Sequence, residues 1–177
     1  MIENWVDNNF QKLVTIRRWL HQHPEVGFDE HDTSKYCQNI MKDLGFEIHQ
    51  TEPMKTGFYC DYGNGTGSTL AVRCDLDALP IQEVNTFDYC SVNPGVSHAC
   101  GHDAHLANIL GLATYIIETE QNIPGTVRFL FQPAEETAPG GAVVMIEGGG
   151  IDGVDHIIGG HILPSLSPMK IGIRYGP

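Results

Sequence analysis

The chain has 177 residues, of which 41% are hydrophobic and 18% are charged, a composition typical of one globular domain with a buried core. No apolar run approaches the roughly 18 residues that a membrane-spanning helix needs. The formal net charge of −12 argues against nucleic acid and against an anionic membrane as a partner. The N-terminal residues lack the basic and apolar regions of a secretory signal, so we expect a cytoplasmic protein.

The five cysteines also favour a reducing compartment. Their number is odd, their spacing is scattered and no CxxC pair occurs, so we expect free thiols rather than a disulfide framework. Cys37, Cys60 and Cys74 are best explained as small buried hydrophobic residues. Cys100 differs because it lies within a segment rich in histidine.

Two helices are predicted in the N-terminal part. Apolar residues recur at spacings of three and four from Ile2 to His21, which indicates an amphipathic helix, and Pro24 prevents its continuation. A second helix is expected from an N-cap at Asp32 or Thr33 to Gly45.

Strands and helices alternate through the rest of the chain. Strands are predicted near 46–50, 57–62, 69–74, 125–131 and 156–161, a loop over 81–95, and helices over 104–118 and 141–147. This alternation predicts an α/β fold with a sheet covered by helices on both faces. The sequence shows no internal repeat and no linker, so we expect one domain.

Polar residues follow several of the predicted strands. Asp75 and Asp77 follow one strand, Glu135 and Glu136 follow another, and His161 ends the last. Ligands of such sheets bind at the carboxyl ends of the strands. We therefore expect these side chains to gather at one edge of the sheet.

The segment from Ser97 to His105 opens a predicted helix at the same edge. It contains three histidines, one cysteine and one aspartate within nine residues, and these are the usual ligands of zinc and similar ions. A buried acidic pair is costly unless a positive charge lies between the carboxylates, which a divalent ion would provide. The alternative is a set of helix caps and core histidines with no bound ion.

The adjacent glutamates Glu135 and Glu136 suggest hydrolysis, most naturally of an amide. One can bind the metal, while its neighbour acts as general base on a water molecule whose pKa the metal lowers. Nucleotide cofactors and a serine nucleophile are not indicated, because the sequence has no GxGxxG motif opening a helix, no P-loop and no GxSxG motif.

Four segments carry a resemblance to a known family. They are 21–25 (HQHPE), 75–83 (DLDALPIQE), 98–105 (HACGHDAH) and 131–136 (FQPAEE). These motifs in this order resemble the M20 metallopeptidases, specifically the amidohydrolases of N-acyl amino acids such as hippurate hydrolases, auxin-conjugate hydrolases and N-acetyldiaminopimelate deacetylases. The resemblance spans about 16–177 and implies a mixed, mostly parallel sheet in a zinc-peptidase-like catalytic domain.

The resemblance also implies roles for individual residues. Cys100, His102, Glu136 and His161 would bind one or two divalent ions, zinc or manganese with nickel and cobalt as alternatives, and Cys100 would bridge them. Glu135 would be the general base, and Asp77 would orient a ligand. His98 and His105 match no ligand position and are interpreted as packing or hydrogen-bonding residues, whereas Asp75 and Asp103 are weaker candidates for supporting the ligands.

Members of this family are about twice as long as this chain. The resemblance implies that residues 1–177 form the N-terminal portion of the catalytic domain, without the lid domain and one last histidine ligand. We therefore expect the isolated chain to be a weak or inactive hydrolase with exposed apolar surface, which self-association or a complementing chain could cover. Two alternatives stay open: an inactive remnant that binds metal or a partner, and a purely structural α/β module.

Overall fold

A mixed four-stranded sheet forms the centre of the computed structural model, which describes residues 2–167 and 169–173. The strands are β1 (Phe58–Gly63), β2 (Thr69–Asp75), β3 (Thr126–Gln132) and β4 (His156–Gly159), in the order β1-β3-β2-β4. β2 is parallel to both of its neighbours, and β1 is antiparallel to β3. The predicted mixed, mostly parallel sheet is therefore confirmed.

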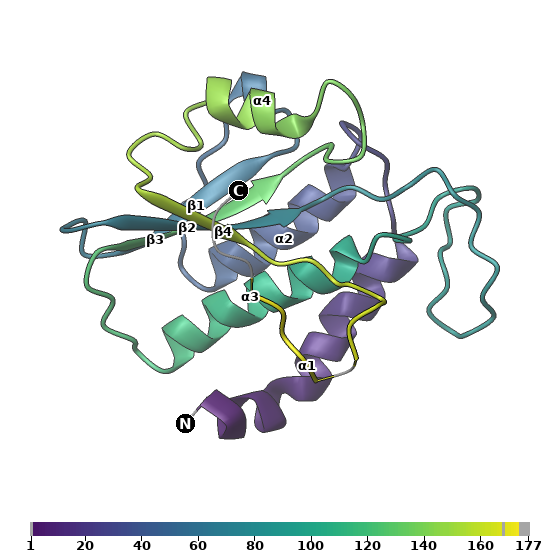
Figure 1. Cartoon of the computed structure of the whole chain (residues 1–177), viewed down its shortest axis with the longest axis horizontal. Helices are drawn as coiled ribbons and strands as arrows, with labels where there is room; N and C mark the ends of the chain where they lie inside the picture. Colours follow the sequence, from purple (N-terminus) through teal and green to yellow (C-terminus); the bar gives the residue numbers. More distant parts are fainter. Residues whose placement is uncertain (1, 168, 174–177) are drawn as a thin grey trace.

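Helices cover both faces of this sheet, as predicted (Figure 1). Helices α1 (Ile2–Gln22), α2 (His31–Asp43) and α3 (His102–Glu118) lie on one face, and α4 (Gly141–Glu147) with the short 3₁₀ helix η1 (Glu52–Met54) lies on the other. α1 and α3 pack closely because α3 carries Gly111, where a Cβ atom would come within 2.9 Å of Leu13. No helix in the described residues is long and apolar enough to cross a membrane.

The larger core lies between the sheet and the three helices α1, α2 and α3. Strands β2 and β3 supply it with nearly continuous apolar runs, as expected for parallel strands buried on both faces. Phe58 and Phe131 stack with ring centroids 4.3 Å apart. A smaller core under α4 consists of Met54, Ala71, Leu130 and Met145.

Several predicted boundaries need correction. Residues 46–50 form no strand in the described structure; the segment pairs with β1 at one isolated bridge, His49 with Tyr59. Helix α2 begins at His31, and its first amides are capped from outside by the carboxylate of Glu25 rather than by Asp32 or Thr33.

Two further differences concern the segments that carry the predicted ligands. α3 begins at His102, two residues earlier than predicted. β4 ends at Gly159, so His161 lies beyond the strand. Strand β4 is also the exposed edge of the sheet, with Ile157 57% and Ile158 55% accessible, so apolar surface is exposed along it.

Candidate metal centre

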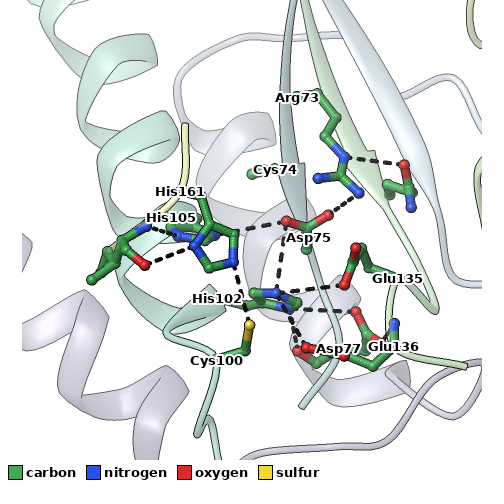
Figure 2. A network of polar contacts seen from close by, with 12 residues as sticks. Arg73, Cys74, Asp75, Asp77, Cys100, His102, His105, Glu135, Glu136 and His161 are labelled. Atoms are coloured by element: carbon green, nitrogen blue, oxygen red, sulfur yellow. Dashed lines mark hydrogen bonds and ion pairs between the residues drawn. The ribbon is translucent and has the colours of Figure 1, made fainter. Parts of the chain in front are cut away.

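The carboxyl ends of three strands meet the first turn of α3 at one edge of the sheet. Asp75 and Gln132 lie side by side at the ends of β2 and β3, so the residues that follow them emerge together. The chain then turns sharply at Ala134, whose φ of 45° lies in the left-handed region. Figure 2 shows the six predicted site residues in one cluster: Asp77, Cys100, His102, Glu135, Glu136 and His161.

His102 is buried at the centre of this cluster and presents a free nitrogen. Its Nδ1 lies 2.8 Å from the carbonyl oxygen of Asp77, which can only accept, so Nδ1 carries the proton. Its Nε2 faces Glu136 at 3.9 Å and Glu135 at 4.0 Å. This nitrogen is buried and has no hydrogen-bond partner among the described residues. A buried lone pair surrounded by carboxylates is the arrangement that a bound cation satisfies.

Asp77 holds two neighbouring groups in place. Its carbonyl oxygen accepts from His102, and its carboxylate Oδ2 accepts the backbone N–H of Glu136 at 2.9 Å. Burial raises the pKa of Asp77, but the contacts with His102 and with the backbone N–H groups of Glu136 and Glu135 outweigh it, so the pKa lies below its ordinary value. This geometry supports the predicted orienting role.

His161 and Cys100 face each other beside His102. The Nδ1 of His161 lies 2.7 Å from the carbonyl oxygen of Ile162 and so carries the proton of the ring. Its Nε2 accepts a hydrogen bond from the Sγ of Cys100 at 3.3 Å. Burial, followed by the nearby carboxylates of Glu136 and Glu135, raises the pKa of the Cys100 thiol to about 12. A divalent ion would reverse this effect, since it stabilises the thiolate that coordinates it.

These donors form two overlapping groups. Cys100, His102 and His161 form one, and His102, Glu135 and Glu136 form the other, with the donor atoms of each group within 4.8 Å of one another. Thiolate and imidazole suit zinc, and added carboxylates widen the choice of divalent ions. The residues therefore fit a divalent ion, and both groups depend on the same lone pair, that of the Nε2 of His102.

A third group has the right distances but the wrong protonation. Asp75, His102 and His105 also have donor atoms within 4.8 Å of one another. However, the Nε2 of His105 accepts the backbone N–H of Ile162 at 3.0 Å, so the neutral ring carries its proton on Nδ1, the atom that faces Asp75. That nitrogen has no lone pair for an ion. Asp75 instead forms an ion pair with Arg73.

The other candidate residues, Asp103 and His98, belong to none of these groups. Asp103 points toward α1, where it forms an ion pair with Arg17 and a hydrogen bond with His21, both at 2.7 Å. It therefore ties α3 to α1 rather than supporting the ligands. His98 is buried in the structure, and neither of its ring nitrogens has a hydrogen-bond partner in the described part of the chain.

Glu30 is a supporting residue that the sequence did not reveal. It is fully buried, and its carboxylate accepts the backbone N–H of Ala134 at 2.7 Å and the hydroxyl of Thr56 at 2.5 Å. It thereby fixes the turn that leads into Glu135 and Glu136. An acidic residue just before a helix is usually a surface group near the helix N-terminus, so the sequence carried no signal for this role.

The chain resembles known proteins over nearly all of its length. The N-acyl-L-amino acid amidohydrolase of Geobacillus stearothermophilus is 45% identical over 177 residues, which is 99% of this chain and 48% of that protein. The N-acetyl-L-cysteine deacetylase of Bacillus subtilis is 42% identical over 94% of this chain and 40% of its own length. The chain thus spans about half the length of these relatives.

A solved structure and a family model agree with these relatives. The YXEP protein of Bacillus subtilis, described as a dinuclear metal binding peptidase from the M20 family, superposes with a TM-score of 0.88 and 41% identity, covering 94% of this chain and 47% of that one. The model of peptidase family M20/M25/M40 matches residues 71–176, which include Asp77, the segment from Cys100 to His102, the glutamate pair and His161. This chain belongs to peptidase family M20/M25/M40.

Proposed function

We propose that residues 1–177 supply the N-terminal part of the catalytic domain of a metal-dependent hydrolase that cleaves the amide bond of N-acyl amino acids. The relatives named as an amidohydrolase and a deacetylase of such compounds support this reaction. The observation that carries the proposal is the buried Nε2 of His102. It has no hydrogen-bond partner among the described residues, and it faces a thiol, a second imidazole and two carboxylates.

The proposed ligands are Cys100, His102, Glu136 and His161, and Cys100 is the residue that would be shared if two ions bind. Zinc and manganese are the proposed metals, and nickel and cobalt suit the same donors. A divalent ion at this position supplies a Lewis acid, which lowers the pKa of a water molecule and polarises the amide carbonyl. Asp77 keeps the proton of His102 on Nδ1 and so leaves Nε2 available to the ion.

Glu135 is the proposed general base. Its side chain is 39% exposed, against 23% for Glu136, so it lies nearer to arriving water and substrate. It accepts a proton as the water oxygen bonds to the carbonyl carbon, and it returns this proton to the amide nitrogen as the carbon–nitrogen bond breaks. The products are a carboxylic acid and a free amine, so the atoms balance.

The proposed substrate is a small molecule, and we propose neither nucleic acid nor a membrane as a partner. The exposed β4 edge, with Ile157 and Ile158, is the proposed contact for self-association or for a complementing chain. The cytoplasm is the proposed compartment. All five cysteines, each within the described residues, are free thiols, which supports a reducing environment.

Metal binding is the first test, because the chain alone is expected to be a weak or inactive hydrolase. The purified chain should bind at least one zinc or manganese ion, and a preparation that binds neither would refute the proposed centre. Glu136→Gln should weaken binding about tenfold or more because it removes a ligand, whereas Glu135→Gln should leave binding nearly unchanged.

Hydrolysis of N-acetyl and N-benzoyl amino acids with added metal tests the reaction itself. Any activity should be abolished by Glu135→Gln, and a fully active Glu135→Gln variant would refute the base assignment. Hydrolysis by the chain with added metal would exclude the alternative, a catalytically inactive remnant that binds metal or a partner chain. The exposed β4 edge supports this alternative, because a partner chain could pair with it.

A further inference from the structure

His161 lies against Cys100 although it belongs to an irregular, exposed segment. β4 ends at Gly159, and residues 160–163 form neither helix nor strand. The bond from the Nδ1 of His161 to Ile162 is local to the segment and cannot hold it against the rest of the protein. Some contact with the folded core must therefore determine where His161 lies.

His105 provides such a contact from the buried face of α3. It lies one helical turn after His102, so both rings point from the helix toward the strand ends. Its Nε2 accepts the backbone N–H of Ile162 at 3.0 Å, and its ring packs edge-on against that of His161, with centroids 4.8 Å apart and an interplanar angle of 65° (Figure 2).

The side chain of Ile162 completes this anchor. It lies over Gly101, where an added Cβ atom would come within 3.3 Å of the Cδ1 of Ile162. Gly101 is the residue between Cys100 and His102. The residue after His161 is thus held by its main chain to His105 and by its side chain to the segment that carries two of the proposed ligands.

His105 is held in one orientation, and its hydrogen bond selects one tautomer of the neutral ring. Because Nε2 accepts from an amide, the proton of the neutral ring is on Nδ1. This nitrogen lies 3.7 Å from the Oδ2 of Asp75, too far for a hydrogen bond but close enough for electrostatic attraction. The ring is nearly fully buried, so its neighbours restrict its rotation. Turning the ring over would also move the proton of Nδ1 away from the carboxylate of Asp75.

We propose that His105 is a positioning residue of the metal centre: through the backbone of Ile162 it holds His161 against Cys100. The proposal rests on the proposed metal centre but not on catalysis by this chain. It assigns to His105 a role separate from that of the ligands. Removing the acceptor at Nε2 should weaken metal binding, although His105 never contacts the ion.

Three substitutions of His105 test whether metal binding depends on the position of the hydrogen-bond acceptor or only on the polarity of the side chain. Glutamine places its carbonyl oxygen about where Nε2 lies, so His105→Gln should bind cobalt(II) within about threefold of the wild type. Asparagine is equally polar but too short to reach Ile162, and leucine has no acceptor. Both His105→Asn and His105→Leu should bind cobalt(II) about tenfold or more weakly, with a weaker thiolate-to-cobalt absorption band. If leucine prevents folding, the glutamine and asparagine pair still decides.

A double-mutant cycle with His161→Ala tests whether His105 acts through His161. His105→Asn should weaken cobalt(II) binding much less in the His161→Ala background than in the wild type, because the ligand that it positions is already gone. His98→Asn is the matched control, because it also replaces a buried histidine near Cys100. Neither ring nitrogen of His98 forms a hydrogen bond in the described part of the chain, so its effect should be small and equal in both backgrounds.

The outcomes distinguish this proposal from the one on which it rests. A wild-type chain that binds no cobalt(II) would overturn the metal centre itself. A wild-type chain that binds the ion, with His105→Asn binding equally well, would overturn only the role of His105. The same conclusion follows if the asparagine effect is undiminished in the His161→Ala background, since His105 would then act by another route.

Discussion

Glu30 offers a direct test of how the fold supports the two site glutamates. Its buried carboxylate accepts hydrogen bonds from Ala134 N–H and from the hydroxyl of Thr56. Burial raises its pKa, which the hydrogen bonds with Thr56 and Ala134 only partly offset. In the protonated form one oxygen would accept from Ala134 and the other would donate to Thr56. Glutamine has the same shape and the same pattern of donor and acceptor, whereas leucine has neither.

The structure gives the size of each effect. Glu30→Leu leaves the Ala134 amide and the Thr56 hydroxyl buried without a partner, and each such group costs about 1–3 kcal/mol. Part of this loss is offset because leucine avoids the cost of burying a polar carboxyl group. We therefore expect the free energy of unfolding to fall by about 2 kcal/mol or more. Glu30→Gln keeps both hydrogen bonds and should stay within about 1 kcal/mol of the wild type.

Urea unfolding followed by circular dichroism measures these differences, with exposed Glu47→Gln and Glu47→Leu as controls. Because the pKa of Glu30 is raised in the folded state, its protonated form stabilises the fold fully below the unfolded pKa of 4.5. This stabilisation is lost as the pH rises through the folded-state pKa. The stability of Glu30→Gln relative to the wild type should therefore increase with pH above 4.5. A leucine variant as stable as the glutamine variant would refute the reasoning.

Three further predictions concern other contacts. Because the Cys100 thiol has its pKa raised to about 12, zinc binding at neutral pH should release about one proton per chain. Calorimetry in two buffers measures this release. Cys100→Ser should not release the proton, and an equal release would contradict the ligand role of Cys100. Buried Arg128 donates to both carboxylate oxygens of Asp61 at 2.8 and 2.7 Å, so Arg128→Met should cost about 2–3 kcal/mol in urea unfolding, and Arg128→Lys should fail to restore it because lysine lacks the paired donors. The hydrogen bond with Asp103 raises the pKa of His21, so protonated His21 stabilises the fold fully below pH 6.5, and this stabilisation is lost as the pH rises through the raised pKa. The difference in stability between the wild type and His21→Gln should therefore narrow at alkaline pH. A constant difference would argue against this linkage.

The long elements were predictable because their signals are local. The spacing of apolar residues over 2–22 depends only on helix geometry, and the apolar runs of β2 and β3 indicate strands that are buried on both faces. The missed strand at 46–50 shows the limit of such signals. A short alternating segment becomes a strand only if a neighbour pairs along its length, and here only His49 does.

The site was predictable in its members but not in its supports. The predicted ligands and base stand out because their residue types are typical of metal centres and they follow strands or open a helix. They are Cys100, His102, Glu135, Glu136 and His161. The partners of Glu30 and His105 carry no such signal, because each residue acts on a backbone amide far away in the sequence, Ala134 and Ile162 respectively. Their roles depend on distances that exist only after folding.

The sequence by itself determined the family, the mixed α/β fold and the set of candidate ligands, because residue type, periodicity and motif order are properties of the chain. Only the tertiary structure decided how those residues act. It set the proton of His102 on Nδ1 through Asp77, gave His105 the backbone amide of Ile162 as its partner, and turned Asp103 toward α1. The physical reason is that hydrogen-bond direction and burial, which control protonation and lone pairs, arise from neighbours that folding brings together.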